Sequence, residues 1–291
     1  MGMSTASRRT VSRATVEKWA WANLVANTLI ILTGGLVRLT SSGLGCPTWP
    51  RCTDESFVPH GALGWHGVIE FGNRTLTYAL MVIAIGTLIA TWRWLDATRL
   101  QLRLALGIAI GIPFQGVIGG ITVLTDLNPW IVSLHLVLSM ALVVAATVFL
   151  AGVRREDEER VPRTPALVVR AAFLVLLVAI YLGTIVTGSG PHAGDADAPR
   201  NGLDPAWWSR THAISVWVFI ALVVAAVVML HGRARRAAVL VLAVGLAQGL
   251  IGYVQYFTDL PWVLVAVHLV GAAVLLAVAT RLVLLARPAA S

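Results

Sequence analysis

Four of the seven histidines share a sequence setting, since each lies within the first turns of an apolar stretch that predicts a helix. Ionisable side chains inside such a span are costly and usually face the interior of a helix bundle. Two imidazoles from facing helices are suited to axial ligation of haem iron, whereas zinc prefers additional ligands such as a carboxylate or a thiolate. A hydrogen bond to a neighbouring helix is the simpler role for a single histidine, and the recurrence favours ligation. The four are His66, His135, His212 and His268.

A second group of polar residues lies on the helix predicted over 64–92. His66, Glu70 and Asn73 are spaced at i, i+4 and i+7 and therefore share one helix face. Glu70 is the only acidic residue deep in any predicted span. One interpretation is an ion pair with Arg74, one turn later. Because the pair would sit inside the membrane, we favour a functional role for Glu70 in proton transfer or substrate positioning.

The two cysteines, Cys46 and Cys52, fall in one predicted outer loop. The outer side of a bacterial plasma membrane is oxidising, which favours a local disulfide. We interpret the pair as a loop staple, and a redox-active pair remains the alternative.

The elements that position these residues are membrane spans. Hydrophobic residues make up 57% of the 291 residues and charged residues only 12%, against roughly 25% charged residues in a soluble domain, and the mean hydropathy is +0.80. The composition excludes a soluble domain, and the net charge of +8 comes from arginines between apolar spans, which argues against a nucleic-acid partner. Eight apolar stretches are each long enough to span the bilayer. They are 19–37, 64–92, 104–124, 129–152, 166–187, 206–230, 237–257 and 261–286.

The distribution of basic residues predicts the orientation of these spans. Seventeen of the 22 Lys and Arg fall on one side of the alternating connections, and basic residues remain cytoplasmic. We therefore expect both termini to be cytoplasmic, with a tail over 1–18 and a linker over 154–165. The first span is expected to be retained rather than cleaved as a signal peptide.

An internal repeat divides the spans into two halves. Shifting the sequence by 133 residues aligns 115–136 with 248–269 with ten identities, including Gln115 with Gln248 and His135 with His268. Four spans per repeat give both halves the same orientation, related by an axis along the membrane normal. The predicted fold is an all-α integral membrane protein of eight transmembrane helices. They form two pseudo-symmetric four-helix bundles, over 19–153 and 166–287.

Three sequence motifs carry a resemblance to a known family over about residues 19 to 286. With the duplicated bundles they resemble haem A synthase, in an actinobacterial-like type with asparagine in place of one haem-ligand histidine. The motifs are Gly34-Gly35-Leu36-Val37-Arg38-Leu39-Thr40 with Gly43-Leu44-Gly45-Cys46-Pro47, Ile69-Glu70-Phe71-Gly72-Asn73-Arg74, and Thr187-Gly188-Ser189-Gly190-Pro191-His192-Ala193-Gly194-Asp195.

The resemblance implies an enzyme of the bacterial cell membrane that oxidises a methyl group of haem O to the formyl group of haem A, for cytochrome oxidase. It implies a haem b cofactor between His212 and His268 in the C-terminal bundle. The N-terminal bundle is expected to receive haem O, with ligands at His135 and at the position of Asn73. A glutamate matching Glu70 is regarded as essential in the family.

This chain departs from the family at Asn73, because a carboxamide is a poor ligand for haem iron. Either His135 alone binds the substrate haem, or His66 replaces the lost ligand, although it lies seven residues, about 10.5 Å of helix rise, from Asn73. The family's second outer cysteine pair, near 190–205, is also missing. Haem O synthase and an electron donor are the expected protein partners, and self-association is left open.

Three other functions were weighed. A membrane cytochrome that only carries electrons predicts two bis-histidine haems and no need for Glu70. A transporter with parallel repeats would need broken helices near the midplane. A plain helical scaffold does not explain the repeated histidines. Haem A synthase therefore remains the leading hypothesis, and the electron-carrying cytochrome is the alternative.

Overall fold

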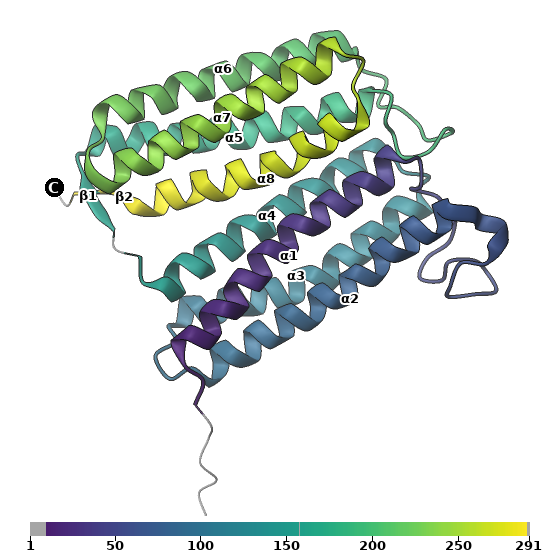
Figure 1. Ribbon diagram of the computed structural model, residues 1–291, viewed down its shortest axis with the longest axis horizontal. Helices are drawn as coiled ribbons and strands as arrows, with labels where there is room; N and C mark the ends of the chain where they lie inside the picture. Colours follow the sequence, from purple (N-terminus) through teal and green to yellow (C-terminus); the bar gives the residue numbers. More distant parts are fainter. Residues whose placement is uncertain (1–9, 157, 290–291) are drawn as a thin grey trace, which may run out of the picture.

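The computed structural model describes residues 10–156 and 158–289, and within them eight long helices account for most of the chain (Figure 1). All eight are long and apolar enough to cross a membrane, which confirms the predicted eight-span, predominantly helical fold. A short 3-10 helix, Gly61–Leu63, directly precedes α2. The helices are α1 (Arg13–Leu39), α2 (Gly64–Arg93), α3 (Arg99–Leu124), α4 (Pro129–Arg154), α5 (Arg163–Ser189), α6 (Pro205–Met229), α7 (Gly232–Phe257) and α8 (Trp262–Leu285).

Several helices begin earlier than their apolar stretches. Helix α1 starts at Arg13 rather than at residue 19, so the end of the predicted tail is helical, while residues 1–9 lie outside the described part. The Ser12 side chain accepts a hydrogen bond from the Thr15 amide and caps this start. Helix α3 starts at Arg99 rather than at residue 104, because Thr98 and Gln101 form a capping box. Hydropathy detects the apolar part of a helix, whereas capping hydrogen bonds define its first turn.

The helices contact one another in two closed groups of four. Helix α1 contacts α2 and α4, and α3 contacts α2 and α4; in the second group α5 contacts α6 and α8, and α7 contacts α6 and α8. The groups lie side by side, joined by contacts of α8 with α1 and α4 and of α4 with α5 (Figure 1). Buried Ile31, Met140 and Val143 of the first group belong to one core with residues of the second. The pseudo-symmetry between the groups and the cytoplasmic placement of the termini stay predictions.

A small parallel sheet was not predicted, and it adds two short strands to the predominantly helical fold. Strand β1 (Glu159–Val161), within the predicted linker over 154–165, pairs with β2 (Ala286–Pro288), which follows α8. The Glu159 carboxylate also accepts a hydrogen bond from the Ala234 amide, 2.8 Å away, in the first turn of α7. A carboxylate at this position is favoured by the helix dipole.

The connections after α1, α3, α5 and α7 gather at one end of the molecule, which we call the disulfide end, since it carries Cys46 and Cys52 (Figure 1). Two of these connections join across the groups, because the Gly43 amide donates to the carbonyl oxygen of Gly194 at 2.8 Å. The first connection therefore contacts both helix groups.

Candidate functional site

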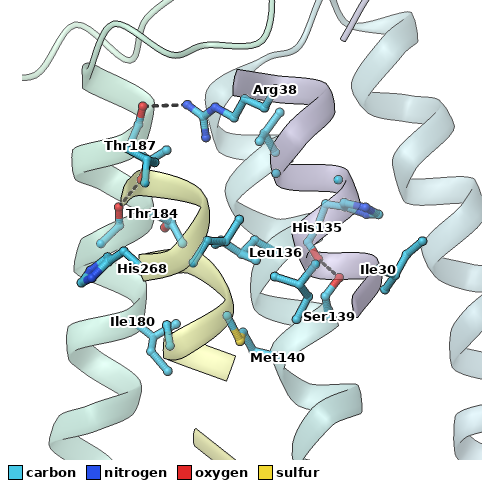
Figure 2. A pocket seen from close by; sticks show the side chains of 18 of the residues that line it. Ile30, Arg38, His135, Leu136, Ser139, Met140, Ile180, Thr184, Thr187 and His268 are labelled. Carbon is cyan, nitrogen blue, oxygen red and sulfur yellow. Dashed lines mark hydrogen bonds between the residues drawn. The ribbon is translucent and has the colours of Figure 1, made fainter. Parts of the chain in front are cut away.

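A cavity of about 830 Å³ extends across both helix groups, and all eight helices contribute to its lining. Its lining includes three of the four predicted ligand histidines: His135 from α4, His212 from α6 and His268 from α8. Leu136 and Met140 lie between His135 and His268 in the view of Figure 2. The volume is in the range of cofactor and ligand pockets, about 300–1,000 Å³.

The two histidines of the second group have defined surroundings. Nδ1 of His212 lies 2.9 Å from the carbonyl oxygen of Ala179. Because a carbonyl can only accept, this nitrogen carries the hydrogen and Nε2 keeps a lone pair available to a metal. A Cβ atom at Gly183 would lie 3.3 Å from Cε1 of His212, and one at Gly252 would lie 3.3 Å from Cε1 of His268. Both imidazoles therefore pack directly against glycines of the preceding helix.

His135 repeats this arrangement in the first group. A Cβ atom at Gly119 would lie 3.4 Å from its Cε1 atom. The Gln115 side chain donates to the carbonyl oxygen of His135 at 3.0 Å and to the Ser139 hydroxyl. The Nδ1 atom of His135 is buried and has no hydrogen-bond partner among the described residues. This imidazole thus retains unused ligand capacity.

Asn73 lines the cavity but is already hydrogen-bonded. The Thr33 hydroxyl donates to Oδ1 of Asn73 at 2.8 Å. This bond occupies one lone pair of Oδ1, and the amide N–H groups of Asn73 are donors that cannot ligate iron. The expectation that Asn73 is a poor substitute for a histidine ligand stays a prediction.

His66 lies apart from the cavity. Its Nδ1 atom is 3.0 Å from the Ser42 hydroxyl, and its ring lies against Trp65 at a tilt of 30°, with a centroid separation of 3.9 Å. Glu70 and Asn73 line the cavity, whereas His66 is absent from the lining among the described residues. The structure therefore gives no support to His66 as the replacement ligand.

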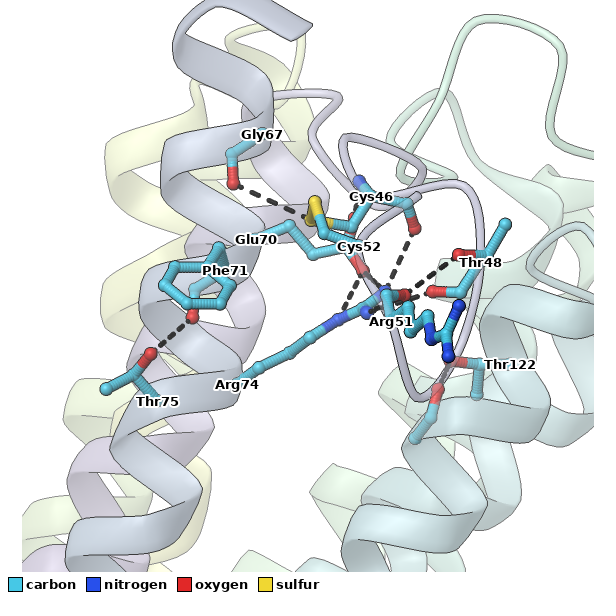
Figure 3. A network of polar contacts seen from close by, with 11 residues as sticks. Cys46, Thr48, Arg51, Cys52, Gly67, Glu70, Phe71, Arg74, Thr75 and Thr122 are labelled. Atoms are coloured by element: carbon cyan, nitrogen blue, oxygen red, sulfur yellow. Dashed lines mark hydrogen bonds and ion pairs between the residues drawn. A yellow bond between two sulfur atoms is a disulfide. The ribbon is translucent and has the colours of Figure 1, made fainter. Parts of the chain in front are cut away.

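Glu70 and Arg74 form the ion pair that the sequence offered as one interpretation, and the pair extends to the first connection (Figure 3). One carboxylate oxygen of Glu70 accepts from the Arg74 guanidinium and the other accepts from the Cys46 amide. Arg74 donates further to the carbonyl oxygens of Cys46 at 2.9 Å, Thr48 at 2.9 Å and Arg51 at 3.1 Å. Buried Glu70 and half-buried Arg74 thus fix the backbone of this loop while both line the cavity.

The loop held by this pair closes the cavity at the disulfide end. Cys46 and Cys52 form a disulfide, as predicted. Trp49 and Pro50 line the cavity, and the Trp49 ring lies so close to α3 that a Cβ atom at Gly120 would clash with it. No ligand or lining role was predicted for Trp49, because a loop tryptophan carries no periodic signal.

His192, which the sequence analysis left without a role, also lines the cavity. Its Nε2 atom is 3.0 Å from the carbonyl oxygen of Leu260, which joins the third and fourth connections at the disulfide end. Among the described residues, no three His, Cys, Asp or Glu side chains converge as a metal-ion site of the zinc type needs. The lone imidazoles, packed on glycines and bordering an apolar cavity, fit haem iron better than a bare metal ion.

Comparisons with known proteins point in the same direction. Residues 17–67 and 65–194 match the model of a family described as cytochrome oxidase assembly protein (COX15-CtaA). Among curated relatives, the "Heme A synthase" of Halalkalibacterium halodurans is 30% identical over 154 residues, which cover 53% of this chain and 50% of that protein. The "Heme A synthase" of Alkalihalophilus pseudofirmus is 30% identical over 173 residues, which cover 58% and 56%.

A third "Heme A synthase", from Bartonella bacilliformis, is 23% identical over 327 aligned positions that cover 91% of this chain and 90% of the relative. The chain thus aligns with about half the length of the first two relatives and with most of the third.

Proposed function

Because this chain belongs to the cytochrome oxidase assembly protein family (COX15-CtaA), we propose that it is a haem A synthase of the bacterial cell membrane. It would oxidise a methyl group of haem O to the formyl group of haem A. The observation that supports this most directly is the shared cavity, which is lined by one histidine of the first helix group and two of the second. Such a cavity places the proposed ligands of the substrate haem and of the cofactor haem around one continuous space.

The cofactor is haem b, held between His212 and His268. The hydrogen bond from His212 to Ala179 supports this role because it leaves Nε2 free and fixes the orientation of the ring. Haem b, when bound, supplies one-electron transfer. The protein's own contribution is to orient the two imidazoles against Gly183 and Gly252 and to surround them with apolar side chains.

The substrate is haem O, bound through His135 alone. Asn73 lines the same cavity and presents amide N–H groups instead of a ligand. Because His66 lies outside the lining, the substrate iron would have a single protein ligand. Asn73 would then donate a hydrogen bond to a polar group of the substrate.

Glu70 is the proposed catalytic residue, as it is the one carboxylate among the lining residues. Its hydrogen bonds to the Cys46 amide and to Arg74 hold it at the cavity wall. Oxidation of a methyl group releases protons, and a fixed carboxylate is suited to accept one. Glu70 would therefore act on the substrate while it holds the loop in place.

The test is a haem analysis of a deletion strain together with the purified protein. We expect deletion of the gene to remove haem A and to leave haem O accumulating in the membrane. Pyridine haemochrome spectra of the purified protein, with the extracted haems separated by chromatography, should show haem b. Normal haem A in the deletion strain would refute the proposal and leave the electron-carrying cytochrome, which no finding otherwise supports.

A further inference from the structure

Arg38, in the last turn of α1, lines the cavity at its disulfide end. Although it belongs to the first helix group, its hydrogen bonds go to the second. Its Nε atom donates to the carbonyl oxygen of His192, and Nη2 donates to the carbonyl oxygen of Thr187 at 2.7 Å (Figure 2). The guanidinium is therefore fixed between α5 and the connection that follows it.

No described residue balances the charge of Arg38 with an ion pair. Three charged side chains line the cavity, and two of them, Glu70 and Arg74, neutralise each other. In the described part of the chain no carboxylate lies within ion-pair distance of Arg38, and its Nη1 atom has no hydrogen-bond partner. A partly desolvated cation without a counter-ion is unfavourable, so the cavity has one positive charge to offer to an anionic ligand.

We propose that Arg38 binds a carboxylate of a haem and thereby orients the macrocycle with its propionates toward the disulfide end. This inference rests on the proposed function, because both haems invoked there carry two propionates on an otherwise apolar ring. Arginine is the side chain best suited to carboxylates, since its planar fork offers two parallel N–H donors. The free Nη1 atom and the remaining hydrogen of Nη2 supply such a pair.

The hydrogen bonds to Thr187 and His192 make the site rigid before any ligand binds. A guanidinium already held by two carbonyl oxygens loses little freedom on binding, which favours affinity. The same bonds allow a purely structural role, in which Arg38 only joins the two helix groups. A structural role does not depend on ligand charge, so the two roles are separable.

The experiment compares protohaem with its dimethyl ester, which lacks the two negative charges. Each is titrated into the purified, haem-depleted full chain in detergent, and affinity is read from the Soret band. We expect the wild type to prefer the diacid by about 10- to 100-fold, the range of a charged hydrogen bond, and Arg38→Gln to lose most of this preference. Thermal unfolding of each variant checks that it is folded.

Arg200→Gln is the matched control. Arg200 also donates to two backbone carbonyls of the same connection, those of Ala198 and Pro191, but it does not line the cavity. Arg200 lies close enough to Arg38 to act on its charge, so Arg200→Gln measures the general effect of removing a nearby cation. It should lose much less of the preference for the diacid than Arg38→Gln. Arg38→Lys retains the charge without the fork and should keep part of the preference, and it serves as the second variant if Arg38→Gln does not fold.

Two further arms identify the haem. The titrations are repeated in His135→Ala and in His268→Ala protein, and the background in which the Arg38-dependent preference survives shows which group's haem is bound. An unchanged preference in Arg38→Gln, or an equal loss of affinity for both probes, would overturn the inference. Neither result touches the proposed function, which fails only if the deletion strain still makes haem A.

Discussion

At the scale of single residues, the three helix histidines that line the cavity, His135, His212 and His268, are positioned in the same way. Each imidazole packs against a glycine of the preceding helix, at Gly119, Gly183 and Gly252. The absence of a Cβ atom at these positions leaves room for the ring and so sets its depth in the bundle. The three glycines thus determine where the histidine rings lie.

The histidines of the second group provide the first prediction. His212→Ala and His268→Ala should each lower the haem b content of the purified protein at least about tenfold, since each removes an iron ligand. Absorbance of the reduced haem per polypeptide measures this. His60→Ala, which changes an exposed histidine before α2, is the control and should bind haem normally. Full occupancy in His212→Ala would contradict the assignment.

Glu70 carries the second prediction. Glu70→Gln preserves size but removes the charge and replaces one of the two acceptor oxygens with an amide donor, and we expect haem A formation to fall about 100-fold, as for loss of a general base. Arg74→Lys keeps a cation beside Glu70 and should retain most activity. Haem A formed per haem O supplied, measured by chromatography, is the readout. If both variants lost activity equally, Glu70 would act only by holding the loop.

The candidate ligand histidines could be predicted from the sequence because an ionisable residue in an apolar span is conspicuous. The internal repeat also places a histidine at the equivalent position of both halves, at His135 and His268. Arg38 and Trp49 were missed for physical reasons. An arginine at a helix end resembles an interfacial residue, and only the folding of the connection 190–204 over it makes it part of the cavity. Trp49 belongs to a loop whose path depends on Arg74, which is distant in sequence.

At the scale of elements, hydropathy predicted the number of helices but not their first turns. Polar residues such as Arg13 and Arg99 extend helices beyond the apolar stretches, and only the caps at Ser12 and Thr98 show where they begin. The strands β1 and β2 are three residues each and far apart in the chain. No period can be read from three residues, so their pairing could not have been predicted.

The disulfide loop provides a third prediction at this scale. In the chain-entropy account, closing a loop of this length stabilises it by about 2 kcal/mol. The double variant Cys46→Ser, Cys52→Ser should therefore raise amide hydrogen exchange in residues 43–56 by about 30-fold, the equivalent of that free energy. Exchange in α6 and α7 serves as the internal control and should not change. Unchanged exchange in the loop would show that Glu70 and Arg74 suffice to hold it.

At the scale of the whole molecule, the two groups of four helices contribute different polar residues to the cavity. The second group contributes two histidines to the cavity, whereas the first contributes His135, Asn73 and Glu70. Because the groups share a core through Ile31 and Met140, they form one cavity rather than two independent sites. A cofactor and a substrate can then lie close together without leaving the protein.

The orientation of the whole molecule in the membrane is the last prediction. The excess of basic residues at the end opposite the disulfide predicts that the disulfide end faces outward. Both cysteines are bonded, so the chain has no free thiol to give a background. A single cysteine can therefore be placed at each end of the molecule. Val58 lies in the first connection and is 54% exposed, and Leu95 lies between α2 and α3 and is 80% exposed. In intact spheroplasts, a membrane-impermeant maleimide should label Val58→Cys at once and Leu95→Cys only after permeabilisation. The reverse pattern would invert the topology and place the Cys46–Cys52 loop, with the cavity it closes, on the cytoplasmic side.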